Sequence, residues 1–590
     1  MKKQDFLIIG ACLVLLFLWF THYAPRGTPP PPQKPAVTDT YAPAGTEQPI
    51  DGSDAPDATA PPEPANERAV AFQSDATSAY SELGPAASVE LTIDGLTSLT
   101  VNPETGGIEE AVLTSYPGEN GMPGMTLGHA PLPMLAVRPA DRPWTFSHAK
   151  VEKNNGQEFG FSRAIENTAL VLTQSLAPNP ESDYAWDYVV TLTNTGSATV
   201  ELDNVQVNCG TMLPLNTSKG FMGAGGYDQR VDFLPSGKKG SKAYIVDKVR
   251  KLQRKPAKLA EMNAWPVDWV AVQNKYFAVI VSVEEGFSGF NPTTEPLEAD
   301  NEEDAGNHII MGAGYLPPFA LAPGESKVFR LGVYIGPKQY TALKQLGGRK
   351  ESVMQFDNLF LIFHFKWMEW ISLLIFRGLV LIGGFTHSYG LAIICLTLII
   401  RTIFWPITHK STVWSKRMQK IQPLAQELRE KYKSDPQKMQ QKTFELYREH
   451  KINPLTGCFP VFVQIPVFFA LFNVLRNAIE LRQEGFLWAK DLSQPDTIGY
   501  IFSIPFNPLA LMMGVTMFIQ QKMMPTSVDP AQQKMMMAMT LFFVFICYTM
   551  PSGIALYWTI NQMVSIFQYY VTQKILDEKD NLATATAGTS

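Results

Sequence analysis

The distribution of apolar residues divides the chain into two parts. Residues 25–355 contain only short apolar segments, whereas residues 359–573 hold nearly all the runs that are long enough to cross a bilayer. The C-terminal part is therefore predicted to be a polytopic α-helical membrane domain.

Short alternating segments in the N-terminal part predict β-strands bounded by turn residues. The clearest are 89–93, 188–193, 200–207, 276–283 and 328–334. Their spacing favours one large all-β domain, a β-sandwich, over 89–355. The preceding residues, 25–88, are rich in Pro, Ala, Thr and Asp and have few large apolar side chains, which predicts an extended linker.

Residues 1–24 are predicted to anchor the chain in the membrane. Lys2 and Lys3 precede an apolar run at 6–20, a pattern that signal peptides and signal anchors share. The following Thr21-His22-Tyr23-Ala24 places bulky residues where a peptidase requires small ones. An uncleaved anchor is favoured over a cleaved signal peptide, and either one exports the β-rich region.

Five apolar segments predict the membrane core over 386–575: 388–408, 454–479, 498–520, 536–549 and 553–571. The tight turn Met550-Pro551-Ser552-Gly553 separates the last two. With the anchor these segments make six crossings, so both termini are expected in the cytoplasm.

The segment 356–385 combines apolar residues with a polar stripe. Lys366, Glu369 and Ser372 recur there at helical spacing, so one face of this helix is polar. The helix can span the bilayer or lie flat. Because the span at 388–408 already supplies the crossing required before the basic loop that follows, we expect an interfacial helix on the outer side.

Charge assigns the loop 409–452 to the cytoplasm. It carries eleven Lys and Arg against five Asp and Glu, and basic residues accumulate on cytoplasmic loops. Apolar helix faces on either side of Ser434-Asp435-Pro436 predict a helical hairpin at 410–452. Its basic balance suits contact with anionic lipids or with ribosomal RNA, although a solvated hairpin of no special role has the same pattern.

The sequence offers few features of an enzyme. Among the five cysteines only Cys209 lies in the exported part, so no disulfide can form within it. A Walker A sequence is absent, and Gly223-Ala-Gly225-Gly226 is an incomplete glycine pattern. We expect no catalytic activity, no cofactor, no metal site and no DNA partner.

Arg401 is the one charge inside an otherwise apolar span. A charge at this depth costs at least about 2.5 kcal/mol and normally marks a polar cavity, with snorkelling to the helix end as the alternative. Thr397 lies on the same helix face. Other spans contribute the amides Gln464, Gln520, Asn561 and Gln562. Together these residues predict a wet cationic groove, which would lower the cost of moving a polar segment of another chain into the bilayer.

Three stretches of the membrane part carry a specific resemblance. They are Asn453-Pro-Leu-Thr-Gly-Cys-Phe-Pro460 running into Gln464-Ile-Pro466-Val-Phe468, Phe486-Leu-Trp488-Ala-Lys-Asp491-Leu-Ser493, and Pro551-Ser-Gly553-Ile-Ala-Leu-Tyr557-Trp558. On these residues, the region 355–575 resembles the YidC/Oxa/Alb family of membrane protein insertases. The exported part, with patches at 269–277 and 336–338, is similar to that of the Gram-negative type, which implies a β-supersandwich.

The resemblance implies an inner-membrane insertase and chaperone for nascent membrane proteins, working alone or with the Sec translocon. In the family, the arginine that matches Arg401 lies in a hydrophilic groove, and residues matching Thr397 and Trp558 line it or contact substrate. Gln464, Gln520 and Tyr557 complete the expected groove. The hairpin matching 410–452 makes early contact with the nascent chain, and no nucleotide is hydrolysed.

The C-terminal tail departs from the family pattern. Many members end in a strongly basic tail that contacts ribosomes, whereas 574–590 carries two basic and three acidic side chains. If a ribosome binds, we therefore expect it at the hairpin rather than at the tail, 576–590. A secondary transporter and an envelope ligand-binding protein are the alternative functions, although no inverted repeat supports the first and five core spans exceed what the second requires.

Overall fold

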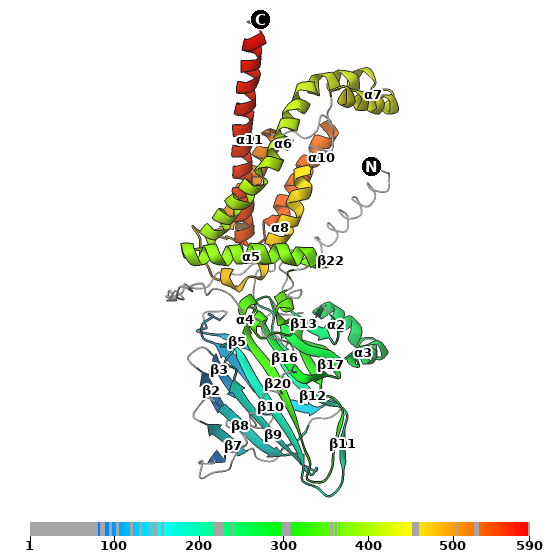
Figure 1. Cartoon of the computed structure of the whole chain (residues 1–590), viewed down its shortest axis with the longest axis vertical. Coiled ribbons are helices and arrows are strands. Elements are labelled where there is room, and N and C mark those ends of the chain that lie inside the picture. The colour runs from blue at the N-terminus through cyan, green and yellow to red at the C-terminus, as the bar shows by residue number, and fades with distance from the viewer. Residues whose placement is uncertain are drawn as a thin grey trace, which may run out of the picture.

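The structure is a computed structural model with a β-rich domain and a helical bundle in contact end to end (Figure 1). It describes residues 81–587 except 83–88, 94–96, 102–105, 119–121, 129–132, 141–143, 147–149, 155–157, 216–228, 239–240, 298–307, 355, 357, 360–362, 365, 451–458, 503 and 524–529. The predicted anchor at 1–24 and nearly all of the linker at 25–88 lie outside the described residues.

A ten-stranded antiparallel sheet forms the main layer of the β-rich domain. Its spatial order is β1(Ser81–Glu82), β7(Lys150–Asn154), β8(Glu158–Ala164), β9(Leu170–Pro178), β10(Ala185–Asn194), β20(Ser326–Pro337), β16(Phe277–Phe287), β15(Val267–Gln273), β13(Arg230–Pro235) and β14(Lys242–Ile245). Along β10 the side chains alternate, so that Tyr188, Val190 and Leu192 are buried on the inner face.

Two four-stranded sheets supply further layers of the β-rich domain. One is ordered β17(Gly289–Pro296), β18(His308–Tyr315), β12(Val205–Met212), β6(Val137–Pro139), and the other β2(Val89–Ile93), β3(Thr97–Val101), β4(Ile108–Leu113), β5(Met125–Leu127). The first packs on β13, β15 and β16, where Phe233 and Phe290 stack with ring centroids 4.0 Å apart. The predicted β-rich domain with sheet-on-sheet packing is confirmed.

The segment 200–207 is two strands and not the one that was predicted. β11(Val200–Leu202) pairs with β19(Phe319–Leu321), whereas β12 begins at Val205 and pairs with β6 and β18. Asp203 and Asn204 lie between them, and both residue types are depleted in strands. The chain changes sheets at this point.

Short helices complete the β-rich domain on the side of the bundle. They are α2(Val246–Gln253), α3(Pro256–Asn263), α4(Tyr340–Gln345) and the 3-10 helix η3(Lys350–Met354). Through α4 and η3 the chain passes from β20 to the first helix of the bundle (Figure 1).

In the described part of the chain, the helices of the bundle are α5(Lys366–Thr386), α6(Tyr389–Lys431), α7(Pro436–Glu449), α8(Phe459–Asn477), α9(Pro508–Met523), α10(Pro530–Cys547) and α11(Ser552–Ala587). α5 lies across the end of the bundle that faces the β-rich domain (Figure 1). α11 packs against both α6 and α9, and α8 packs against α5 and α6. By length and composition, Met368–Thr386 and Tyr389–Met418 qualify as membrane spans, and Lys534–Cys547 is a shorter apolar helix.

The predicted span 498–520 is wrong at its beginning. β23(Gly499–Ile501) and β24(Ile504–Phe506) form a small hairpin there, and the helix starts only at Pro508. Proline suits the first position of a helix because its missing N–H needs no partner there. The Asp496 carboxylate accepts a hydrogen bond of 2.6 Å from the Leu509 N–H, which stabilises this start.

The predicted span 388–408 continues without a break into the hairpin. α6 has 43 residues, so it is about 65 Å long and exceeds the hydrocarbon core of a bilayer, about 30 Å. Trp414, Met418, Ile421 and Ala425 of α6 form an apolar cluster with Leu446 of α7. α6 and α7 thus form a helical hairpin whose two helices pack through this apolar cluster.

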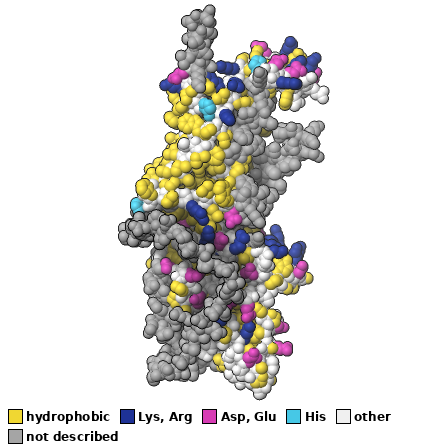
Figure 2. Space-filling model, in the orientation of Figure 1, with side chains coloured by type: hydrophobic (Ala, Val, Ile, Leu, Met, Phe, Trp, Pro, Cys, Tyr) yellow, Lys and Arg dark blue, Asp and Glu magenta, His cyan; other side chains and the backbone are white. Residues whose placement is uncertain are grey.

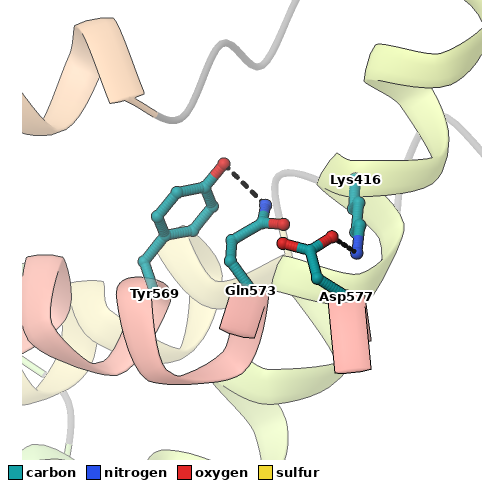
Figure 3. Close-up of polar contacts among 4 residues, drawn as sticks. All are labelled: Lys416, Tyr569, Gln573 and Asp577. Atoms are coloured by element: carbon teal, nitrogen blue, oxygen red, sulfur yellow. Dashed lines mark hydrogen bonds and ion pairs between the residues drawn. The ribbon is translucent and has the colours of Figure 1, made fainter. Parts of the chain in front are cut away.

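Polar contacts join α6 to α11 next to the hairpin (Figure 3). Lys416 Nζ lies 2.6 Å from Asp577 Oδ1, and their side chains are 14% and 64% exposed. One turn earlier on α11, Gln573 Nε2 donates a hydrogen bond of 2.8 Å to the Tyr569 hydroxyl. The base of the hairpin is thus tied to the C-terminal helix.

The surface of the bundle is apolar over its middle. Figure 2 shows a broad hydrophobic belt over the helices, with Lys and Arg at its far end and again near the β-rich domain. Ile403 of α6, Leu541 of α10 and Phe567 of α11 are among the exposed apolar residues. On the face that Figure 2 shows, such an apolar belt is the kind of surface that a lipid bilayer requires.

Candidate functional site

Arg401 lies inside the bundle and is held by α11. Its side chain is only 8% exposed, and its Nε donates a hydrogen bond of 2.5 Å to Asn561 Oδ1. The backbone carbonyl of Arg401 accepts a second bond, of 3.2 Å, from Gln568 Nε2. Among the described residues, Asn561 is the one hydrogen-bond partner of the guanidinium, so donors remain for a further ligand.

A polar stripe on α11 explains these contacts. Tyr557, Asn561, Ser565 and Gln568 recur at spacings of four, four and three residues, which places them on one side of a helix. The stripe meets three other helices. Asn561 contacts Arg401 of α6, the Tyr557 hydroxyl accepts from Gln464 Nε2 of α8 at 2.6 Å, and Ser565 Oγ accepts from Gln520 Nε2 of α9 at 2.8 Å.

Thr397 is close to Arg401 in sequence but takes no part in these side-chain contacts. It is fully buried one turn before Arg401 on α6. Its hydroxyl donates a hydrogen bond of 2.6 Å to the carbonyl of Ile393 on the same helix. The structure therefore places Thr397 on the predicted face, with its donor already used.

An aromatic cluster borders the polar stripe. Trp558 is half-buried and packs edge-on against Phe468 of α8, with ring centroids 4.9 Å apart. It also packs against Phe543 of α10, with tilted rings and centroids 4.8 Å apart. Its Nε1 is buried and has no hydrogen-bond partner within the described part of the chain. Trp558 thus presents a free donor beside an apolar wall.

Most of the predicted residues lie on α11 or contact it. Arg401 and Gln464 bond to the first part of the polar stripe, at Asn561 and Tyr557. Gln520 bonds to Ser565 further along the stripe, and Trp558 belongs to the aromatic cluster. Asn561 was expected only as one of several amides, and Ser565 and Gln568 were not expected. The repeat of polar residues every three or four positions on α11 is the signal that identifies them.

The site can attract a polar or acidic group. Arg401 makes no ion pair with any described residue, so its positive charge is not neutralised locally. Uncharged donors and acceptors surround it on α8 and α11. Groups of three or more His, Cys, Asp or Glu that would hold a metal ion are not found in the described part of the chain. An unneutralised cation among apolar helices attracts an anionic segment.

Both parts of the chain match known families. Residues 381–579 match the family described as 60Kd inner membrane protein, and residues 137–377 match the YidC periplasmic domain. The chain belongs to the YidC family. All the site residues lie in the inner-membrane match, whereas most of the β-rich domain lies in the periplasmic match.

Curated relatives within the YidC family share about two fifths of the aligned residues. The chain is 40% identical over 311 residues to the membrane protein insertase YidC of Syntrophobacter fumaroxidans, which covers 52% of this chain and 53% of that protein. It is 36% identical over 387 residues to that of Geotalea daltonii, with 65% of each chain covered. The chain thus matches about half of the length of the first of these relatives.

Among solved structures, the chain is similar to a YidC insertase whose first transmembrane domain is resolved. The identity is 19%, the match covers 84% of this chain and 93% of that chain, and the TM-score is 0.34. The YidC of Thermotoga maritima matches at 15% identity, with 83% and 100% covered and a TM-score of 0.28.

Proposed function

We propose that this chain is a membrane protein insertase and chaperone, which inserts and folds integral membrane proteins in the inner membrane. The observation that carries the proposal is the site at Arg401, an unneutralised cation held by polar side chains among apolar helices. Membership of the YidC family supports the proposal, because its curated relatives are named membrane protein insertases.

The mechanism that we propose is electrostatic and needs no covalent step. A polar or acidic segment of a client would exchange part of its hydration for the free donors of Arg401 and for the neighbouring polar stripe of α11. This contact lowers the cost of bringing the segment partway across the bilayer. Apolar parts of the client would rest on the wall formed by Phe468, Phe543 and Trp558.

The proposed topology has five core spans, α6, α8, α9, α10 and α11, in addition to the anchor at 1–24. Both termini and the hairpin lie in the cytoplasm, and the β-rich domain lies in the periplasm. The basic balance of 409–452 supports this orientation. The position of α5 across the end of the bundle supports its placement in the outer interface (Figure 1).

The proposed partners follow from the charge and position of the hairpin. α7 and the distal half of α6 extend beyond the apolar belt and carry most of the basic residues of 409–452. We propose that this surface receives the nascent chain and contacts anionic lipids or the ribosome. Cooperation with the Sec translocon is proposed from family membership alone.

The test is insertion of a short single-span client in cells depleted of their own insertase. Cells that express this chain are expected to insert the client, as judged by protease protection of its exported end, whereas cells with an empty vector are not. If this chain is present in the membrane at a normal level and the client remains uninserted, the proposed function is contradicted.

A further inference from the structure

A recess of about 630 Å³ lies between the β-rich domain and α5. α4 contributes Tyr340 and Lys344 to its wall, and α5 contributes Phe376, Arg377, Val380 and Leu381. The recess therefore combines two cations with an apolar wall. None of its lining residues belongs to α11, and it contains two cations where the polar stripe of α11 has uncharged side chains.

The exposed face of α5 is apolar except for one cation. Trp370, Leu374, Leu381 and Phe385 are exposed on this face, and Phe385 reaches 86%. Their spacing of four, seven and four residues marks one side of a helix, with Arg377 in the middle. An exposed apolar stripe on a helix that lies flat is the pattern of a membrane interface, where the apolar residues enter the acyl region.

Arg377 has no protein partner in the described part of the chain. No described residue forms a hydrogen bond or ion pair with its guanidinium, and the described residues that line the recess include no Asp or Glu. Lys344 has its Nζ over the Tyr340 ring at 5.7 Å from the centroid, which leaves its ammonium donors available. The charge of the recess is therefore complementary to an anion.

The wall of the recess is held in place before any ligand binds. Phe376 packs against Tyr340 and Phe356, with ring centroids 6.1 and 5.5 Å apart. One turn earlier on α5, the Ser372 hydroxyl donates a hydrogen bond of 3.0 Å to the Phe356 carbonyl. These contacts fix α5 against α4, so the two cations are presented without a large rearrangement.

We propose that this recess binds the headgroup of one anionic phospholipid from the outer leaflet. Arg377 and Lys344 donate to the phosphate oxygens, for which a guanidinium and an ammonium are well suited. Val380 and Leu381 contact the glycerol and the first methylenes of the acyl chains. The inference rests on the proposed position of α5 in the outer interface, and it gives the β-rich domain a lipid-mediated contact with the membrane.

The test is native mass spectrometry of the purified full chain titrated with phosphatidylglycerol. We expect the most tightly bound lipid to have at least about ten-fold lower affinity for the Arg377→Gln/Lys344→Gln double variant than for the unaltered chain. The reason is that each cation near a membrane surface contributes a few-fold in affinity. Arg330→Gln, which removes an exposed arginine from β20, is the matched control and should bind like the unaltered chain. Equal retention by the double variant and by Arg330→Gln would overturn the proposal.

Two further arms identify the ligand. Inorganic phosphate at millimolar concentration is expected not to displace the lipid, and Leu381→Ser is expected to weaken lipid retention because an acyl contact is lost. Displacement by phosphate, or an unchanged Leu381→Ser variant, would mean that the recess does not hold a phospholipid. The same preparations are assayed for client insertion, so a loss of lipid binding with normal insertion separates this inference from the proposed function.

Discussion

At the scale of single residues, the bundle is organised around one buried guanidinium. The Arg401 guanidinium donates to Asn561 of α11, and the Arg401 carbonyl accepts from Gln568 of the same helix. Both the side chain and the backbone of Arg401 are therefore hydrogen-bonded to α11. An arginine buried among apolar side chains persists only where polar groups compensate for lost hydration. The α11 stripe supplies that compensation.

Replacement of Asn561 by leucine should destabilise the bundle. The Arg401 guanidinium would lose its hydrogen-bond partner, which costs on the order of 1–3 kcal/mol. Thermal unfolding of the purified protein in detergent measures the effect. Gln562→Leu is the matched control, because Gln562 is a buried neighbour whose side chain makes no hydrogen bond to any described residue. Equal shifts for the two variants would show that the Arg401–Asn561 contact contributes little.

Glu480 is a second residue whose buried environment affects stability, here as a function of pH. It lies in η5(Ile479–Leu481), just after α8, and its Oε2 is buried with no hydrogen-bond partner among the described residues. Burial raises the pKa of Glu480 from 4.5 to about 7. The folded protein thus keeps a proton that the unfolded chain releases between about pH 4.5 and pH 7, so this carboxyl lowers stability as the pH rises through that range.

Glu480→Gln should remove this pH dependence. The amide cannot ionise, so the variant gains stability relative to the unaltered chain above about pH 7 and gains little near pH 4.5. Unfolding temperatures measured from pH 4.5 to pH 8 provide the comparison, with exposed Glu295→Gln on β17 as control. A gain of the same size at both ends of the range would contradict the assignment.

At the scale of elements, apolar patterns predicted the existence of the core helices better than their limits. The segments at α8, α10 and α11 are rich in apolar residues, so a helix is predicted at each of them. The hairpin at 499–506 was assigned to a span because Tyr500, Ile501 and Ile504 are apolar, and only the prolines at 505 and 508 indicated otherwise. Contacts between helices, such as Arg401 with Asn561, depend on packing that no periodicity within one segment specifies.

The β-rich domain shows the same limit. Alternation identified β10, β16 and β20, each of which crosses the centre of the large sheet. The pairing order was not predictable, because β10 pairs with β20, which lies more than a hundred residues later in the chain. Local sequence sets which residues face inward, whereas the order of strands is set by how whole sheets bury their faces.

The ion pair between Lys416 and Asp577 should contribute only modestly to stability. Asp577 is largely exposed, so the pair is screened by water and salt and is worth less than about 1 kcal/mol. We expect Asp577→Asn to accelerate hydrogen exchange in α11 beyond this residue by a few-fold at low salt, and to have no effect in molar salt. Glu578→Gln, on the next residue, should leave exchange unchanged, and a salt-independent effect of Asp577→Asn would argue against an electrostatic tie.

At the scale of the whole molecule, the two parts meet through a few specific contacts. Arg482 of the bundle donates a hydrogen bond of 3.0 Å to the Pro117 carbonyl, and its guanidinium lies 5.4 Å from the Phe277 ring centroid. The polar stripe of α11 and Arg401 are formed by bundle helices alone. Among the described residues, the β-rich domain therefore contacts the bundle but supplies none of the side chains that hydrogen-bond in the Arg401 site.

Removal of residues 91–340 should leave client insertion largely intact. The deletion takes away the partners of Arg482 but none of the residues of the Arg401 site, so we expect a lower stability and a nearly normal insertion level. Insertion of a single-span client in insertase-depleted cells measures the outcome. A stably expressed deletion variant that does not insert would assign an essential part of the function to the β-rich domain.

The working role of Arg401 is tested by comparing Arg401→Ala with Lys522→Ala in that insertion assay, at matched expression and with a client that carries an acidic exported tail. Lys522 is an exposed cation near the end of α9, so the control makes the same change in charge outside the site. We expect at least about a ten-fold loss of insertion for Arg401→Ala, since an attraction between opposite charges in this environment exceeds about 1.4 kcal/mol, and normal insertion for Lys522→Ala. Equal insertion by the two variants would contradict a working role for Arg401 and leave it a structural residue of the bundle.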